Sequence, residues 1–184
     1  MASAETFEFR GAHTIVTGAA SGIGLELCKR LLTRSVASIS LVDICETGLQ
    51  AAANGLTATG TKAIIRTYVA DISKEQEVQL TIQAVHKEFG GLDVVFANAG
   101  IGPGGRFMDM PCEHFDHLMN VNYMGVVHTL KAALPICLKQ QSGKLVVTNS
   151  LGGYHGILGA PACCASKFAT RGLVESLRLE VYQP

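Results

Sequence analysis

Short apolar runs alternate with amphipathic segments along the chain, and each kind has its own spacing. β-Branched and aliphatic residues fill the runs, whereas the longer segments repeat apolar residues at helical spacing. We expect strands near 13–17, 38–42, 63–69, 93–97 and 144–149, and helices near 22–33, 46–57, 74–89, 112–138 and 162–181. This alternation predicts an α/β, Rossmann-type doubly wound parallel sheet of strand order 3-2-1-4-5, in a single domain over residues 1–184.

A glycine-rich segment, Thr17 to Gly24, joins the first predicted strand to a helical pattern that begins at Leu25. Gly18 allows a tight turn, Gly22 lets the backbone approach a pyrophosphate, and Gly24 lets helix and strand pack closely. The free N–H groups at the helix start attract an anion. The segment therefore predicts a phosphate-binding loop; the alternative is an ordinary glycine-rich βα turn.

The second predicted strand ends in Asp43. A carboxylate there accepts hydrogen bonds from both ribose hydroxyls of an adenosine and repels a 2′-phosphate. No Arg or Lys lies between Gly18 and Gly24 to neutralise such a phosphate. The pattern favours NAD over NADP as cofactor. The alternative is that Asp43 caps the helix that begins near Glu46.

Two further predicted strands lead into polar turns, Ala70-Asp71-Ile72 and Asn98-Ala99-Gly100. The carboxyl ends of parallel strands meet at one edge of a sheet, so these turns should converge with the glycine segment on one crevice. With these motifs the chain resembles the short-chain dehydrogenase/reductase family from about Gly11 to Tyr182. The resemblance implies an NAD(P)-binding domain and hydride transfer between a nicotinamide and a secondary alcohol or ketone. It implies cofactor contacts at Gly18, Ser21, Gly22, Ile23, Gly24, Asp43, Asp71, Ile72, Asn98, Ala99, Gly100 and Lys167.

The resemblance also implies a catalytic set, Asn122, Ser150, Cys163 and Lys167. Positions 163 and 167 share one helix face, where Lys167 can also donate to the nicotinamide ribose. Ser150 is expected to orient and polarise the substrate oxygen. Asn122 is expected, through its helix, to hold a water chain behind Lys167.

Cys163 stands where the family carries its catalytic tyrosine. A thiol is a weak donor, and its sulfur lies one bond beyond Cβ, whereas a general acid must come within about 3 Å or one water of its target. We interpret Cys163 as a small, half-buried helix residue, with transfer through a bridging water as the alternative. Tyr154 is expected to line the substrate pocket and is a second candidate proton donor. His155 is interpreted as a solvated or capping loop residue.

Composition narrows the class of protein. The 184 residues are 48% hydrophobic and 16% charged with net charge zero, which gives no electrostatic footprint for nucleic acid or an anionic membrane. No apolar run reaches the roughly 18 residues of a membrane span, and the N-terminus lacks a signal-peptide core, so we expect a cytoplasmic protein. The six cysteines lack metal-ligand spacing and are interpreted as reduced thiols, with no metal site.

Several expectations concern the later helices. Pro111 suits the first turn of the fourth helical segment, and Pro135 should kink or end it. The family's chains usually continue further, so the fifth strand is expected to be an exposed edge. The family pairs its fourth and fifth helices across a two-fold axis, which implies a homodimer or homotetramer. The apolar positions there fit an interface or the core equally: Phe115, Leu118, Val126, Leu130, Phe168, Leu173 and Leu177.

Two function classes stay open. The first is an NAD-dependent oxidoreductase acting on a small-molecule alcohol or ketone. The second is a catalytically impaired or truncated family member that binds nucleotide or a partner subunit.

Overall fold

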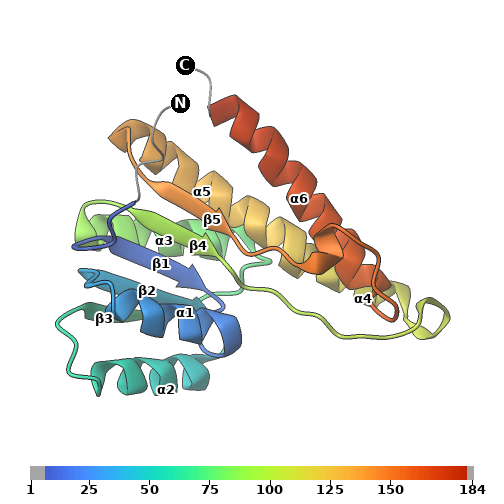
Figure 1. The fold of residues 1–184 in the computed structure, drawn as a ribbon, viewed down its shortest axis with the longest axis horizontal. Coiled ribbons are helices and arrows are strands. Elements are labelled where there is room, and N and C mark those ends of the chain that lie inside the picture. Colours follow the sequence, from blue (N-terminus) through green and yellow to red (C-terminus); the bar gives the residue numbers. More distant parts are fainter. Residues whose placement is uncertain (1–6, 182–184) are drawn as a thin grey trace.

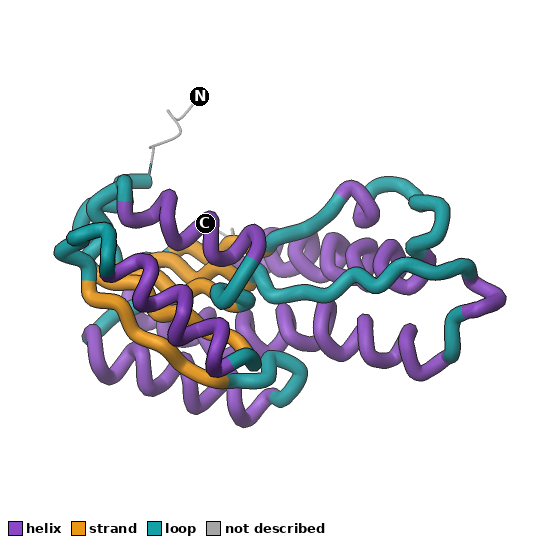
Figure 2. The backbone as a smooth tube through the Cα atoms, turned by 90° about the horizontal axis from the view of Figure 1, so that it is seen from below, coloured by secondary structure: helices purple, strands orange, loops and turns teal. Residues whose placement is uncertain are grey.

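The computed structural model describes residues 7–181, and the five predicted strands form one parallel sheet. Its order, β3-β2-β1-β4-β5, confirms the predicted topology. Figure 1 shows the strands side by side with helices packed around them, and Figure 2 shows helices on either side of the sheet. The strands are β1 (His13–Thr17), β2 (Ser38–Asp43), β3 (Ile64–Val69), β4 (Val94–Ala97) and β5 (Lys144–Val147).

Six α-helices connect and cover the strands, with their bounds close to the prediction. They are α1 (Gly22–Leu32), α2 (Glu46–Thr57), α3 (Glu75–Phe89), α4 (Cys112–Met119), α5 (Gly125–Gln140) and α6 (Pro161–Val181). Successive strand residues face opposite sides of the sheet, so Val16 packs with α1 and α2 while its neighbour Ile15 packs with α3 and α5. Both faces of β1 are therefore buried, which explains why its adjacent residues Ile15 and Val16 are both apolar.

The fourth helical segment differs from the prediction of one helix over 112–138. A π-helical turn, Asn120–Met124, separates α4 from α5, and α5 continues through Pro135 to Gln140. Pro135 was expected to kink or end the helix, and the second expectation is wrong: α5 ends where Gln141 takes a left-handed φ of 54°. A π-turn adds one residue to a helical turn and leaves the apolar spacing on either side nearly unchanged, so periodicity does not reveal it.

The stretch Cys112–Gln140 is long and apolar enough to cross a membrane by length and composition alone. In the structure, however, α5 packs against α3, and seven of its residues are buried. Leu118, Val126 and Leu130 are at most 4% exposed, so these three candidate interface residues belong to the core. Core packing therefore accounts for much of the apolar content of this stretch.

We expect Leu41→Ala to lower the free energy of unfolding by about 2–5 kcal/mol, because Leu41 is fully buried between β2 and the helices over it. Guanidinium unfolding of the two proteins measures the difference. Leu80→Ala on α3 is the matched control, since Leu80 is 59% exposed and its truncation should change stability by no more than about 0.5 kcal/mol. Equal midpoints for the two variants would contradict this account of the core.

Candidate functional site

A cavity of about 620 Å³ opens at the carboxyl ends of the strands. It collects most of the residues that the sequence pointed to, from the glycine loop after β1 to the start of α6. Of the predicted site residues, those that line it are Gly18, Ser21, Gly22, Ile23, Gly24, Asp43, Asp71, Ile72, Asn98, Ala99, Gly100, Ser150, Cys163 and Lys167. Asn122 and Tyr154 are not among the lining residues.

The loop between β1 and α1 has the geometry of a phosphate cradle. Gly18 and Gly22 adopt φ of 68° and 54°, a region that favours glycine. A Cβ at Gly18 would lie 2.8 Å from the Cα of Ala99, and one at Gly24 would overlap the carbonyl oxygen of Gly18. A Cβ at Gly22 would meet nothing within 4 Å, so the backbone there is open to the cavity. The residues present therefore fit a pyrophosphate beside the start of α1.

Thr17 and Asn98 join the strand ends that carry this loop. The Thr17 hydroxyl oxygen accepts hydrogen bonds from the backbone N–H of Asn98 at 2.9 Å and of Ala99 at 3.0 Å. The Asn98 amide donates to the Thr17 carbonyl oxygen at 3.0 Å, and its own oxygen accepts from the Thr148 hydroxyl at 3.0 Å. These bonds link the ends of β1, β4 and β5. Asn98 thus shapes the cavity wall as well as lining it.

The Asp43 carboxylate lies between the glycine loop and α2. Its two oxygens accept from the backbone N–H of Ala20 at 3.0 Å and of Cys45 at 3.1 Å. The cap of α2 is Cys45, whose sulfur accepts from the N–H of Gly48 at 3.4 Å. The alternative in which Asp43 caps the helix is therefore wrong. Each carboxylate oxygen keeps a further lone pair for a ribose hydroxyl in the cavity.

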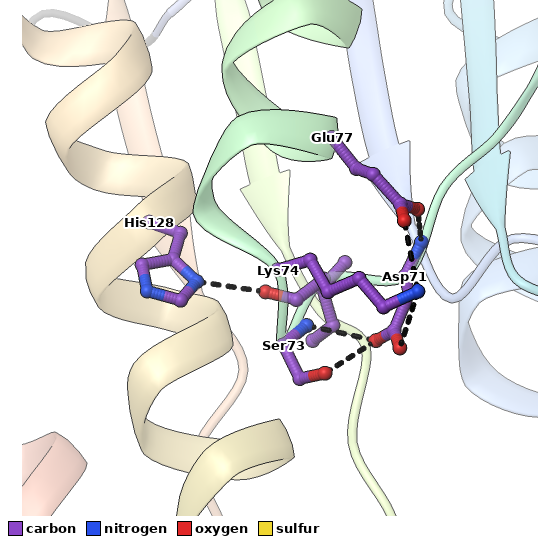
Figure 3. A network of polar contacts seen from close by, with 6 residues as sticks. Asp71, Ser73, Lys74, Glu77 and His128 are labelled. Atoms are coloured by element: carbon purple, nitrogen blue, oxygen red, sulfur yellow. Dashed lines mark hydrogen bonds and ion pairs between the residues drawn. The ribbon is translucent and has the colours of Figure 1, made fainter.

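Asp71 lies beside this position, after β3. One carboxylate oxygen accepts from the backbone and the hydroxyl of Ser73 at 2.9 and 2.7 Å, and Lys74 lies 3.9 Å from the other (Figure 3). Partial burial alone would raise the pKa of Asp71, but these hydrogen bonds from Ser73, with the charge of Lys74, hold it below its usual value. The cavity therefore has an ionised carboxylate on this side.

Ser150, Cys163 and Lys167 meet at the opposite end of the cavity. The Ser150 oxygen accepts from the N–H of Gly152 at 3.1 Å, which leaves the hydroxyl hydrogen to donate to a substrate. Lys167 is only 7% exposed, and its ammonium donates to the Thr148 carbonyl at 3.0 Å. Burial lowers the pKa of Lys167, while the nearby Cys163 sulfur acts in the other direction. Cys163 is half-buried, as its sequence context predicted.

Asn122 lies behind the cavity wall, fully buried in the π-helical turn. Its side-chain oxygen accepts from the N–H of Ile101 at 2.8 Å, and its side-chain nitrogen donates to the Ile101 carbonyl at 2.9 Å and to the Ser166 hydroxyl at 3.0 Å. Its backbone carbonyl accepts from the Thr170 hydroxyl at 3.1 Å. Asn122 therefore fixes the loop after β4 against α6. The water chain that the resemblance implies stays a prediction.

Tyr154 is not among the residues that line this cavity. Its side chain is 55% exposed, and the Arg171 guanidinium carbon lies 4.2 Å from the centre of its ring. The contact is a cation–π interaction that holds the phenol against α6, outside the cavity lining. The expectation that Tyr154 lines the substrate pocket therefore stays a prediction. His155 is exposed, which agrees with a solvated loop residue.

Several lining residues were missed from the sequence. Some had a signal, because Ile44 follows Asp43, and Thr148 and Asn149 precede Ser150 at a strand end. His117 had none, since it sits on α4 within an ordinary polar helical pattern. The full set missed is Ile44, Ala70, Ile101, His117, Val121, Thr148 and Asn149. All six cysteines are free, and the described residues hold no cluster of three or more potential metal ligands.

Comparisons with known proteins agree with this architecture. The family model for short chain dehydrogenases matches residues 12–184. The 3-ketodihydrosphingosine reductase of Dictyostelium discoideum is 34% identical over 95% of this chain and 57% of its own length. The levodione reductase of Leifsonia aquatica is 34% identical over 97% of this chain and 67% of its own.

Solved structures give the same result. The short chain dehydrogenase/reductase from Burkholderia phymatum, crystallised in complex with NAD, superposes with a TM-score of 0.88 at 30% identity, covering 95% of this chain and 62% of that one. The chain thus spans between 57% and 67% of the length of these three proteins. The family model covers nearly every residue, and the fold agrees with that of the solved relatives. The chain therefore belongs to the short-chain dehydrogenase/reductase family.

Proposed function

We propose that the chain binds NAD(H) in this cavity and acts as an oxidoreductase. The proposed reaction transfers hydride between the nicotinamide and a secondary alcohol or ketone. The observation that carries the proposal is the joining of three parts in one cavity: the glycine cradle, the Asp43 carboxylate, and the Ser150 and Lys167 pair. The relatives' names describe reductases, one of them of a keto compound.

The preference for NAD(H) rests on the charge at Asp43. A 2′-phosphate placed near its carboxylate would meet a like charge in a half-buried position, which is strongly unfavourable. The neighbouring Ile44 is apolar and 66% exposed, so it supplies no compensating positive charge. Solved relatives include complexes with NAD and with an NADP derivative, so the family alone does not decide the cofactor.

The chain's own groups divide the work at the reacting end. Bound nicotinamide supplies or accepts the hydride. Ser150 donates its free hydroxyl hydrogen to the substrate oxygen and orients it. Lys167 has two ammonium hydrogens beyond the one given to Thr148, and these can bind the nicotinamide ribose. A proton must also reach or leave the substrate oxygen, and the Cys163 thiol is too short to transfer it directly, so turnover is expected to be slow unless a water bridges the two.

A second function is favoured by that same residue. Cys163 removes the family's phenol while the cradle, Asp43 and Lys167 stay in place. In this second function, the chain binds nucleotide or a partner subunit and turns over little substrate. The two functions differ in turnover and agree on nucleotide binding.

For cofactor choice, we expect Asp43→Asn to weaken NADH binding and to lower the preference for NADH over NADPH by about tenfold or more, because the repelling charge is removed. Isothermal calorimetry with both nucleotides measures the ratio. Glu46→Gln is the matched control, since it removes an acidic charge at the start of α2 that does not line the cavity. Tighter binding of NADPH than of NADH to the unmodified protein would overturn the proposed preference.

For catalysis, we expect the unmodified chain to bind NADH yet reduce ketones slowly, and Cys163→Tyr to raise kcat by about 10²–10⁴-fold, the usual effect of a positioned general acid. NADH oxidation with a panel of ketones, including levodione, is followed by absorbance. If the thiol or Tyr154 works through water instead, Cys163→Ala or Tyr154→Phe lowers a measurable starting activity. Rapid reduction that neither substitution changes would show that the proton donor is another group.

For assembly, we propose a homodimer that buries exposed apolar residues of α6, among them Phe168 at 45% and Leu179 at 75% exposure. Phe168→Glu should then shift the protein toward monomer in light scattering, because a charge in a buried interface is costly. Leu80→Glu on α3 is the control and should leave the mass unchanged. A monomer at micromolar concentration with a folded circular dichroism spectrum would contradict the dimer.

We also propose a cytoplasmic location for the protein.

A further inference from the structure

We propose that His128 and Gly125 of α5 are positioning residues for the adenosine half of the bound nucleotide, and that they act by holding Ile72. The inference rests on the proposed nucleotide function. Neither residue lines the cavity, whereas Ile72 does. They therefore act on the nucleotide through the position of one wall.

Ile72 belongs to the wall beside Asp43, far from the reacting groups. The backbone N–H of Ala70 donates to the Asp43 carbonyl at 3.0 Å, so the segment after β3 runs next to the end of β2. Ser150 and Lys167 follow β5, at the other edge of the sheet. A nucleotide whose ribose meets Asp43 thus places its adenine near Ile72 and its nicotinamide near Ser150.

The Ile72 side chain packs directly on Gly125. A Cβ at position 125 would overlap Cδ1 of Ile72 and lie 3.0 Å from its Cγ1. Ile72 is 8% exposed, so its side chain fills the space between α5 and the cavity. Only glycine at 125 leaves room for this arrangement.

The Ile72 backbone is held by His128. Nδ1 of His128 lies 3.0 Å from the Ile72 carbonyl oxygen, and the imidazole is 8% exposed. A carbonyl oxygen can only accept, so Nδ1 carries the hydrogen in this contact. Figure 3 shows the ring reaching from its helix to the loop, with the Asp71, Ser73 and Lys74 contacts beyond it. Of the hydrogen bonds in residues 7–181, this is the one that satisfies that oxygen.

The contact is part of a larger arrangement along this segment. Asn122 lies in the π-turn, and Gly125 and His128 follow it at the start of α5. Asn122 holds Ile101 in the loop after β4, whereas Gly125 and His128 hold Ile72 in the loop after β3. The π-turn and the start of α5 therefore fix two different loops that line the cavity, and His128 and Gly125 act on the one that carries Ile72.

Loss of the His128 donor should free the wall without unfolding the sheet. α3 still holds the loop, because Glu77 accepts from the N–H of Asp71 at 2.8 Å. The buried Ile72 carbonyl is left without a partner, however, and the loop gains by moving toward water. If the binding position is then occupied for only about a tenth of the time, the apparent affinity for the adenosine half falls about tenfold.

Two nucleotide fragments separate this role from a general loss of structure. ADP-ribose carries the adenosine half, and reduced nicotinamide mononucleotide carries the other. Ligand-observed NMR titrations of the full chain measure both dissociation constants. We expect His128→Leu and Gly125→Ala each to weaken ADP-ribose about tenfold and to change the mononucleotide by less than about twofold. His128→Asn keeps an N–H at the same number of bonds from Cβ and should bind ADP-ribose within about threefold of the unmodified chain.

Thr129→Val is the matched control on the same helix. Thr129 is fully buried, and its hydroxyl donates to the Gly125 carbonyl at 2.7 Å without touching the cavity. It should leave ADP-ribose affinity unchanged. The proposal is overturned if folded His128→Leu and Gly125→Ala bind ADP-ribose as the unmodified chain does, or if both fragments weaken equally. If His128→Leu fails to fold, Gly125→Ala and His128→Asn decide. An unmodified chain that binds neither fragment overturns the proposed nucleotide function itself.

Discussion

The hydrogen bonds between Thr17 and Asn98 are the constraint on which the rest of the site depends. One hydroxyl accepts from two backbone N–H groups after β4, and one amide returns a bond to the end of β1. Asn98 extends the link to β5 through the Thr148 hydroxyl. Parallel strands end in loops without any hydrogen-bond ladder of their own, so the loops' positions are set by such side chains. The glycine cradle and the Ser150 loop therefore keep a fixed relation.

Thr148 also connects this hydrogen-bonded frame to a buried positive charge. Its carbonyl accepts from the ammonium of Lys167, a residue that is only 7% exposed and has no carboxylate partner among residues 7–181. Burial lowers the pKa of Lys167 below its unfolded value of 10.5. The folded state thus binds fewer protons than the unfolded state between the lowered pKa and 10.5, and stability rises with pH across that window. Below it the full cost of the buried charge is present. The chain carries that cost for an ammonium turned toward the cavity.

Much of the fold and of the cofactor side followed from the sequence, because apolar period and glycine position are direct consequences of backbone geometry. The strand order and the glycines of the loop after β1 were predictable in this way, and the family resemblance added Asp71 and Asn98, whereas Ile44 and Ala70 were missed. The π-turn at Asn122 was not, since one extra residue in a helical turn leaves the apolar period intact on either side. Nor was the turn of Tyr154 toward Arg171, which depends on a contact between distant elements. His128 looked like one more polar residue of an amphipathic helix, and its role appears only when Ile72 is placed beside it.

The two ends of the cavity differ in how many groups build them, and that difference decides what Cys163 does. The nucleotide side is made by backbone N–H groups, three glycines, two carboxylates and a hydrogen-bonded frame, so no single side chain carries it. In the proposed reaction, the proton-transfer side depends on one donor at one position, and the Cys163 thiol is too short to reach the substrate oxygen. A substitution at 163 can therefore remove turnover and leave the cavity, the cradle and the buried ammonium as they are. In the proposed function, nucleotide binding and proton transfer are separable because the fold supplies the first through many contacts and the second through one.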